Sequence, residues 1–399
     1  MCIMTRATTI VGIDMGTYTT RVVVSRVSES GNPQLLGIGK SASRGLRSGY
    51  VTDIQQATKS LRTAINDAQK NTGMQITEAL LAIGGVSLQA EHIATTLEIT
   101  HHSGEISEND ITHALDICED ILLSKHSNRR VLHRIPLKYK LDGQLSLGRP
   151  IGLKAKKMSI KTLFITALDH HVEDLIGTAQ SAGISVVDIA AAPLVASLPV
   201  LSHNDRKAGV ALLDIGSETS SLVVFDDGHP LSMEIFSIGS ADITHDLALG
   251  FQISLEDADA LKKGTLQPSK ARKYAKSRVE EIVSARLTDV SELVEKHLVS
   301  IKKNHLLPAG IVITGGGAHI EILPQIMKNN LRLPIRIAAD GITQQSKQKA
   351  FDASWYVAYG LCVWAINDGY MKHSQASDFV FFVKNIGRKI IKFLKHLLP

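Results

Sequence analysis

The chain has 399 residues, of which 44% are hydrophobic and 21% charged, as expected for a globular protein of two or more domains. Aromatic residues make up only 5%, which argues against stacking platforms for nucleic acid. The net charge of +5 arises in residues 384–399, which carry five basic residues and no acid. The three cysteines are scattered, and no apolar run reaches the length of a membrane-spanning helix, about 20 residues. The first residues lack a long apolar core, so a secretion signal is not expected.

The first element in chain order is a predicted β-hairpin at residues 8–28. An apolar strand runs into Asp14-x-Gly16, small polar residues follow, and a second apolar strand returns. The glycine lets the backbone approach a ligand, and the N–H groups and hydroxyls of such a turn can bind phosphate oxygens. The aspartate can hold a hydrated cation. A single motif of this kind also occurs in ordinary hairpins.

Between residues 29 and 205, the sequence pattern changes twice. Up to residue 86 it predicts a strand, a helix capped by Asp53 and a buried strand, at 35–39, 53–70 and 79–85. It then predicts a strand, a helix capped by Ser107 and two more strands, at 88–100, 107–122, 131–141 and 158–168. Helix, strand and helix follow at 171–182, 186–189 and 193–201. The middle group indicates an inserted α+β unit, and the alternative is additional sheet of the first domain.

The motif of the first hairpin returns 200 residues later. Residues 211–224 align with residues 11–24, so that Asp214 falls on Asp14. Two copies near the starts of two halves of similar size predict a duplicated domain that closes on one phosphate chain from both sides. The second half continues with a strand, a helix, a charged helical stretch, a buried strand and a closing helix, at 231–236, 241–249, 254–305, 311–314 and 355–367. The glycines at 315–317 allow close approach of a ligand, although they also suit a plain strand-to-helix turn.

The end of the chain has the pattern of an amphipathic helix. On a helix that turns about 100° per residue, the apolar side chains of residues 382–398 fill one arc and the basic ones fill the opposite arc. An interfacial membrane helix needs both arcs. The alternative is the apolar groove of a partner protein. The predicted membrane contacts are Phe382, Val383, Ile386, Arg388, Lys389, Ile390, Lys392, Phe393, Leu394, Lys395 and Leu397.

Taken together, these motifs resemble the actin, Hsp70 and sugar-kinase superfamily. The hairpins are similar to its two phosphate loops, residues 315–318 to its adenosine loop, and residues 356–361 to its second inter-domain connector. Within the superfamily the chain most resembles the FtsA family, actin-like tethers of the bacterial division ring, over nearly its whole length. The segments that carry this resemblance are 43–53, 130–136 and 210–262, with the inserted unit and the basic tail.

The resemblance implies an α/β fold of the actin-like (ribonuclease H-like) type, with duplicated domains around a nucleotide cleft. It implies an inserted strand-helix-strand-strand subdomain of the SHS2 type. The expected organisation is domain 1A at 1–86 and 170–205, subdomain 1C at 87–169, domain 2A at 206–249 and 306–370, subdomain 2B at 250–305, a linker at 371–381 and the membrane-targeting helix at 382–399.

The resemblance also implies a site for ATP and Mg²⁺. The first phosphate loop would contain Asp14, Gly16, Thr17 and Tyr18, and the second Asp214, Gly216, Ser217, Glu218 and Thr219. The two aspartates would face Mg²⁺ through water. Gly239 would lie near the ribose, Asp259 and Lys262 would contact the nucleoside, and Gly315, Gly316 and Gly317 would pass under the purine. Without the resemblance, Asp259 and Lys262 read equally well as charges of a surface helix.

The chain departs from the pattern of the superfamily in three places. Ser217-Glu218 replaces two glycines, which puts a carboxylate near phosphates. Thr19 replaces a lysine that relatives often carry, and Ala192 stands where many have an acid that orients the attacking water. We therefore expect ATP binding with slow hydrolysis.

The implied function is that of an ATP-binding cell-division protein. It would form filaments on the cytoplasmic face of the cell membrane at the division site, as a peripheral protein. Its partners would be FtsZ, further copies of itself, anionic lipid and later division proteins, and not nucleic acid. Two alternatives are a scaffold of the type IV pilus machinery and a small-molecule kinase of the superfamily. The lipid-type tail argues against the scaffold, and the lack of a catalytic acid argues against the kinase.

Overall fold

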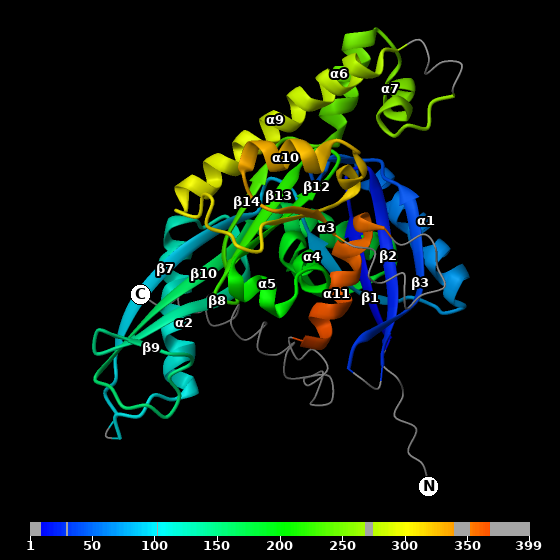
Figure 1. Cartoon of the computed structure of the whole chain (residues 1–399). Helices are drawn as coiled ribbons and strands as arrows, with labels where there is room; N and C mark the ends of the chain where they lie inside the picture. The colour runs from blue at the N-terminus through cyan, green and yellow to red at the C-terminus, as the bar shows by residue number, and fades with distance from the viewer. Residues whose placement is uncertain (1–8, 29–30, 102, 268–273, 339–351, 368–399) are drawn as a thin grey trace.

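The structure is a computed structural model that describes residues 9–28, 31–101, 103–267, 274–338 and 352–367. Two five-stranded sheets form the body of the molecule, and a four-stranded sheet extends to one side (Figure 1). The predicted linker at 371–381 and membrane helix at 382–399 lie outside the described residues. None of the described helices is both long enough and apolar enough to cross a bilayer.

The first sheet has the strand order β11-β6-β1-β2-β3. Its strands are β1 (Thr9–Met15), β2 (Thr19–Val27), β3 (Pro33–Ala42), β6 (Glu78–Ile83) and β11 (Ser185–Ala191). β1 pairs antiparallel with β2 and parallel with β6. A small hairpin and three helices accompany this sheet: β4 (Leu46–Arg47), β5 (Tyr50–Val51), α1 (Ile54–Thr72), α3 (Asp169–Ser181) and α4 (Ala192–Val200). Asp53 caps α1 as predicted, because its side chain accepts the Gln56 N–H.

The second sheet, β14-β13-β12-β15-β16, repeats the first strand for strand. Its strands are β12 (Val210–Ile215), β13 (Ser220–Asp226), β14 (His229–Phe236), β15 (Ile311–Thr314) and β16 (Ile335–Ile337). β12 pairs antiparallel with β13 and parallel with β15, as β1 does with β2 and β6. This repetition confirms the duplicated domains that the hairpins predict, and it agrees with the actin-like fold that the resemblance implies.

The remaining helices cover this second sheet and link the two halves. They are α5 (His203–Ala208), α6 (Ser240–Phe251), α7 (Leu255–Lys262), α9 (Lys276–Ser300), η1 (Gly316–His319), α10 (Leu323–Leu331), η2 (Ala353–Trp355) and α11 (Tyr356–Asn367). α11 packs against α4 and β1. A Cβ atom on Gly360 would lie 2.1 Å from the carbonyl oxygen of Val195, so the predicted glycine-mediated helix crossing is confirmed.

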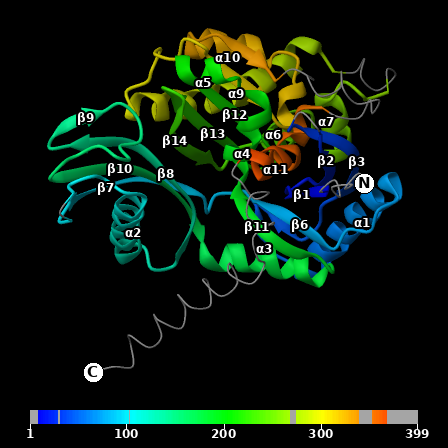
Figure 2. The same ribbon diagram turned by 90° about the horizontal axis from the view of Figure 1, so that it is seen from below.

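The inserted unit has its own sheet and its own core. β7 (Gln89–Glu98), α2 (Glu108–Lys125), β8 (Arg129–Leu141), β9 (Gln144–Ser146) and β10 (Lys157–Leu168) follow in chain order. The sheet order is β7-β10-β8-β9, with α2 packed on one face (Figure 2). Ile111 of α2 and Phe164 of β10 are buried in this core, separate from the main one. The alternative of additional sheet in the first domain is therefore excluded, and β9 is a short strand that the sequence pattern does not predict.

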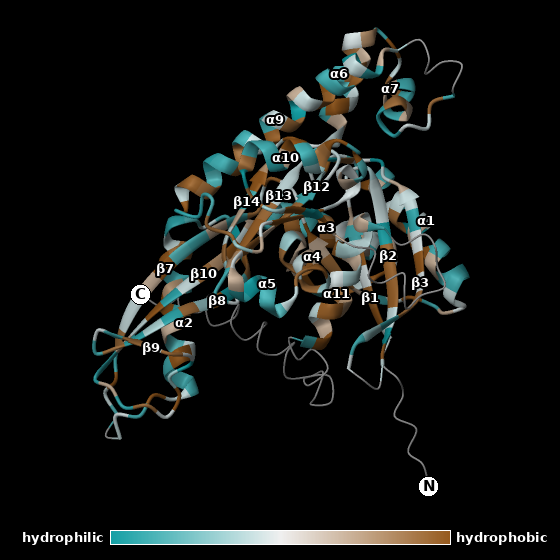
Figure 3. Ribbon diagram, in the orientation of Figure 1, coloured by the Kyte–Doolittle hydropathy of each residue, from teal (hydrophilic) through white to brown (hydrophobic). Residues whose placement is uncertain are grey.

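The hydrophobic residues concentrate where the two large sheets meet their helices (Figure 3). β1 and β12 are apolar along almost their whole length because both faces of each strand are covered. Each of these strands has an aspartate as its penultimate residue, Asp14 in β1 and Asp214 in β12. The two buried strands thus place one carboxylate each at equivalent positions of the two sheets.

Candidate functional site

A cleft of about 740 Å³ separates the two halves, which is within the usual range for a small-molecule site. Both hairpin turns line it, together with the N-terminal part of α6, the end of α7 and the glycine turn after β15. The cleft brings together thirteen predicted residues: Asp14, Gly16, Thr17, Tyr18, Asp214, Gly216, Ser217, Thr219, Asp259, Lys262, Gly315, Gly316 and Gly317. The structure does not place Glu218 or Gly239 in its lining.

Asp14 and Asp214 are the most perturbed acids of the cleft. Burial raises the pKa of Asp14 to about 6, against the opposing charge of Arg21. Burial, followed by the nearby charge of Asp14, raises the pKa of Asp214 to about 7. Two desolvated carboxylates at one point repel each other and favour a bound cation. The described residues contain no cluster of three or more metal-ligating side chains, so water and ligand oxygens would complete the coordination of any cation here.

The glycine turn packs closely on the second aspartate. A Cβ atom on Gly315 would lie 2.1 Å from Asp214 Oδ1, and the φ angle of Gly315 is 87°. A Cβ atom on Gly317 would lie 2.4 Å from Ile215 Cγ2, whereas one on Gly316 would meet no atom within 4 Å. The outer glycines are therefore required by packing on β12, while the middle one leaves open space beside the cleft for a flat group.

Two basic side chains of the first sheet line the cleft, and sequence reasoning did not single them out. Arg21 lies opposite Asp14 in the pairing of β1 with β2, and Lys40 lies opposite Arg21 in the pairing of β2 with β3. The guanidinium carbon of Arg21 lies 5.6 Å from the ring centre of Trp355. These two cations offset the lysine missing at position 19. Strand periodicity puts residues 19 and 21 on one face, but only the register with β1 and β3 puts Arg21 in the cleft.

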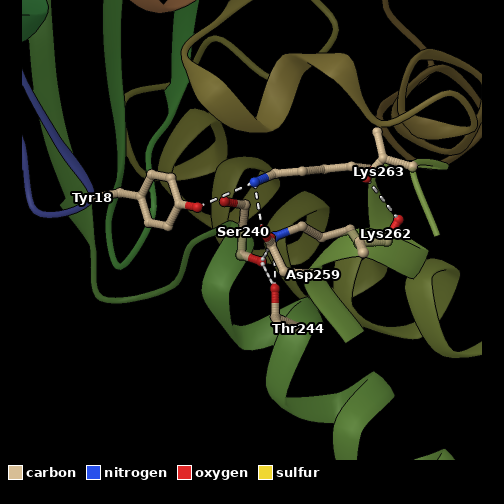
Figure 4. Close-up of polar contacts among 8 residues, drawn as sticks. Tyr18, Ser240, Thr244, Asp259, Lys262 and Lys263 are labelled. Atoms are coloured by element: carbon tan, nitrogen blue, oxygen red, sulfur yellow. Dashed lines mark hydrogen bonds and ion pairs between the residues drawn. The ribbon is translucent and has the colours of Figure 1, made fainter. Parts of the chain in front are cut away.

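Asp259, Lys262 and Lys263 form a charged cluster at the mouth of the cleft (Figure 4). Lys262 Nζ donates to the Ser240 carbonyl at 2.9 Å and to Thr244 Oγ1 at 2.7 Å, and its side chain is only 8% exposed. The bonds to Ser240 and Thr244 tie α7 to α6, and Lys262 also pairs with Asp259 of its own helix at 3.0 Å. A plain surface-helix charge does not have this environment.

Lys263, which was not predicted, reaches the opposite domain. Its Nζ lies 2.5 Å from Asp259 Oδ2, 3.3 Å from the Tyr18 hydroxyl and 4.9 Å from the Tyr18 ring centre (Figure 4). A cation over a tyrosine ring is attracted by the π electrons. The contact joins the first hairpin turn to the helical cluster of the second domain and closes the mouth of the cleft on one side.

Glu218 does not line the cleft and instead contacts the first domain. Its Oε2 accepts the backbone N–H of Ser48 at 2.6 Å, so the carboxylate is engaged by the first domain. This contact relieves the repulsion expected from an acid in the second loop. Gly239 lies behind that loop, where a Cβ atom would come within 2.3 Å of the Ser217 carbonyl oxygen. Its absent side chain lets the loop pack on the start of α6.

The position expected to hold a water-orienting acid is apolar. Ala192 and Pro193 line the cleft at the start of α4. Glu256 and Asp352 also line the cleft, together with His245 and His319, and no motif in the sequence points to these four positions. The cleft is thus equipped to hold an anionic ligand with a cation, and it lacks a carboxylate at the start of α4.

Two family models match the sequence. The model of cell division protein FtsA matches residues 211–360, and that of the SHS2 domain inserted in FtsA matches residues 85–166. Cell division protein FtsA of Pseudomonas aeruginosa is 26% identical over 346 residues, covering 82% of each chain. That of Escherichia coli K12 is 25% identical over 374 residues, covering 86% of this chain and 88% of the relative. That of Bacillus subtilis is 24% identical over 345 residues, covering 81% and 78%.

Solved structures share the fold. The PilM–PilN type IV pilus biogenesis complex contains a chain that superposes with a TM-score of 0.68 at 14% identity, covering 90% of this chain and 98% of that one. MreB 5 of Spiroplasma citri bound to AMPPNP superposes with a TM-score of 0.54 at 12% identity, covering 92% and 98%. At these identities the likeness concerns the fold. The two family models and the division-protein relatives together show that the chain belongs to the FtsA family of actin-like cell-division proteins.

Proposed function

We propose that this FtsA-family chain binds Mg²⁺-ATP in the cleft between its two domains. The observation that carries the proposal is the pair Asp14 and Asp214, two half-buried carboxylates with raised pKa values on duplicated hairpins that face one cleft. A cation bound between two such carboxylates would favour their charged forms. A Mg²⁺ ion, when bound, would neutralise these carboxylates and screen the phosphate charges.

The other cleft residues suit the parts of a nucleotide. The hairpin turns at residues 16–18 and 216–219 offer hydroxyl and backbone donors to phosphates, and Arg21 and Lys40 offer positive charge. The open side of Gly316 and the neighbouring His245 and His319 suit a flat base. Lys263, over Tyr18, holds the mouth closed.

We propose that hydrolysis is slow. General-base catalysis needs a proton acceptor within hydrogen-bond reach of the attacking water. Ala192 leaves none at the start of α4, and Glu218 is bonded to Ser48. ATP would then act as a structural ligand that sets the closure of the cleft.

We further propose that the protein assembles into actin-like filaments on the cytoplasmic face of the membrane at the division site. There it would tether FtsZ and recruit later division proteins. Membership of a cell-division family supports the division role, and the apolar and basic arcs of residues 382–398 support attachment to anionic lipid. The inserted unit would serve contacts with neighbouring copies or later division proteins, because its own core lets it add surface to the body.

Calorimetry of the full chain with ATP and Mg²⁺ tests the nucleotide site. Asp214→Ala should weaken binding at least tenfold, since it removes a charged group beside the cation, about 1.4 kcal/mol or more. Asp289→Ala, an exposed carboxylate on α9, is the matched control and should bind as the wild type does. Equal affinity of wild type and Asp214→Ala would refute this assignment.

A further inference from the structure

A continuous series of hydrogen bonds runs from the cleft to the neck of the inserted unit. The neck is the place where the chain enters this unit near Ser87 and leaves it near Thr166. The series begins at the Ser48–Gly49 turn between β4 and β5. Glu218 of the second domain accepts the Ser48 N–H at 2.6 Å, and Thr17 Oγ1 of the first hairpin turn accepts the Gly49 N–H at 3.3 Å. One turn therefore touches both phosphate loops, one from each domain.

The turn is held in an unusual backbone conformation. Ser48 has a φ angle of 48° and Gly49 one of 89°, in the left-handed region that non-glycine residues rarely adopt. A Cβ atom on Gly49 would lie 2.5 Å from the Cα of Gly85, which follows β6. Contacts with Glu218, Thr17 and Gly85 thus hold the turn in this conformation. A strained backbone conformation is stable only where its surroundings hold it in this way.

His171 carries the series onward. This buried side chain lies at the start of α3, with Nε2 2.9 Å from the Gly49 carbonyl oxygen and Nδ1 in contact with Ser87 Oγ. A carbonyl oxygen only accepts, so Nε2 carries the proton and the Ser87 hydroxyl donates to Nδ1. Tyr50 stacks on the imidazole, with the ring centres 4.4 Å apart. Burial lowers the pKa of His171, which favours this neutral form.

Arg129 completes the series at the neck. Its guanidinium donates to the Ser87 carbonyl oxygen and, through Nε at 2.7 Å, to Thr166 Oγ1. Ser87 lies where the chain enters the inserted unit, and Thr166 lies near where it leaves. Arg129 is itself on β8 of that unit. The buried side chain of Arg129 therefore bonds to both chain segments of the neck. Ser87 in turn contacts His171, which connects the neck to the turn beside the cleft.

We propose that Glu218 and His171 are positioning residues that couple nucleotide in the cleft to the orientation of the inserted unit. This inference rests on the proposed nucleotide site. When the two domains close on ATP, Glu218 bonds to Ser48 and holds the Ser48–Gly49 turn in place. The turn then holds the imidazole of His171, which contacts Ser87 at the neck. Opening of the cleft removes Glu218 from one end of the series. Because coupling is reciprocal, the same contact strengthens nucleotide binding.

Hydrogen exchange of the full chain with and without saturating Mg²⁺-ATP tests the coupling. In the wild type, nucleotide should slow exchange in peptides over residues 85–93 and 127–134. Glu218→Ala should lose this protection at the neck and bind ATP about threefold to tenfold more weakly, while Glu218→Gln, which keeps an acceptor oxygen, should retain both. Ser87→Ala should lose the protection at the neck and, because the coupling is reciprocal, should weaken ATP binding by no more than Glu218→Ala does, since it leaves the contact between Glu218 and Ser48 in place.

Glu281→Ala, an exposed acid on α9, is the control and should behave as the wild type does. Full protection of the neck in Glu218→Ala or Ser87→Ala would overturn the coupling. A wild type that binds ATP with no change of exchange at the neck would also overturn it and leave the nucleotide site standing. A wild type that binds no ATP would refute the proposed function as well, so the two failures are distinguishable.

Discussion

Asp214→Asn should stabilise the nucleotide-free protein and abolish its stabilisation by Mg²⁺-ATP. In the folded protein, burial and the charge of Asp14 oppose ionisation of Asp214 and raise its pKa from 3.8 to about 7. Asparagine has nearly the same shape and carries no charge. The substitution therefore removes a repulsion that only a bound cation would otherwise relieve.

The size of the effect follows from the pKa. An increase from 3.8 to about 7 corresponds to about 4 kcal/mol of free energy that opposes ionisation. The side chain is partly accessible from the cleft, and water there reduces the cost, so we expect a gain of about 1–2 kcal/mol in the free energy of unfolding at pH 8. Between pH 4 and 7 the folded state binds more protons than the unfolded state, so wild-type stability falls as pH rises across this window. The advantage of the variant should therefore shrink towards pH 4.

Urea unfolding of wild type and variant at pH 5 and pH 8, with and without Mg²⁺-ATP, measures these quantities. Asp289→Asn, an exposed carboxylate on α9, serves as the control and should be nearly neutral. Lower stability of Asp214→Asn at pH 8 without nucleotide would refute the account of the aspartate pair. So would undiminished stabilisation of the variant by Mg²⁺-ATP.

Four further outcomes are expected. Steady-state ATP hydrolysis should stay below about 1 s⁻¹, and a higher turnover in a phosphate-release assay would contradict the slow hydrolysis expected from Ala192. Lys263→Ala should speed ATP dissociation severalfold in stopped-flow measurements, because it removes the contact with Tyr18 at the mouth of the cleft. Lys276→Ala, which changes an exposed lysine on α9, is the control. Equal dissociation rates of the two variants would exclude this closure. Gly360→Val should destabilise the protein by about 3 kcal/mol or more, because its side chain would clash with the backbone of Val195. Gly177→Ala, in α3 with no atom nearby, is the control and should be neutral or stabilising. Equal unfolding curves of Gly360→Val and the wild type would contradict the packing of α11 on α4. Phe393→Glu should abolish flotation with anionic vesicles and Lys389→Glu should reduce it, and undiminished flotation of both would rule out the tail as anchor.

The fold was predictable because its signals are local. The two apolar runs that end in Asp14 and Asp214 mark the duplicated hairpins, and the change of periodicity near residue 87 marks the inserted unit. Ser107 forms its capping box with Asp110, three residues away. Signals of this range can be read from one chain.

The parts of the site that escaped prediction depend on distant partners. The carboxylate of Glu218 bonds to the backbone N–H of Ser48, which is 170 positions away in the sequence. Lys263 gains its contact from Tyr18 on the other domain, and Arg21 reaches the cleft through the register of its strand. These arrangements are set by how the two domains close, for which no short pattern exists. The departures at positions 19 and 218 were visible in the sequence, but their compensation was not.

Co-pelleting of the full chain with FtsZ and anionic vesicles, with and without Mg²⁺-ATP, tests the central claim most directly. The account predicts that FtsZ pellets with vesicles only when this protein is present, more so with ATP, and not with a chain truncated before residue 382. Neutral vesicles should recruit little of either protein at low salt, because the basic arc then has no anionic partner. Equal recruitment of FtsZ by the truncated chain, or no recruitment by the full chain with ATP, would contradict the proposed role as a membrane tether.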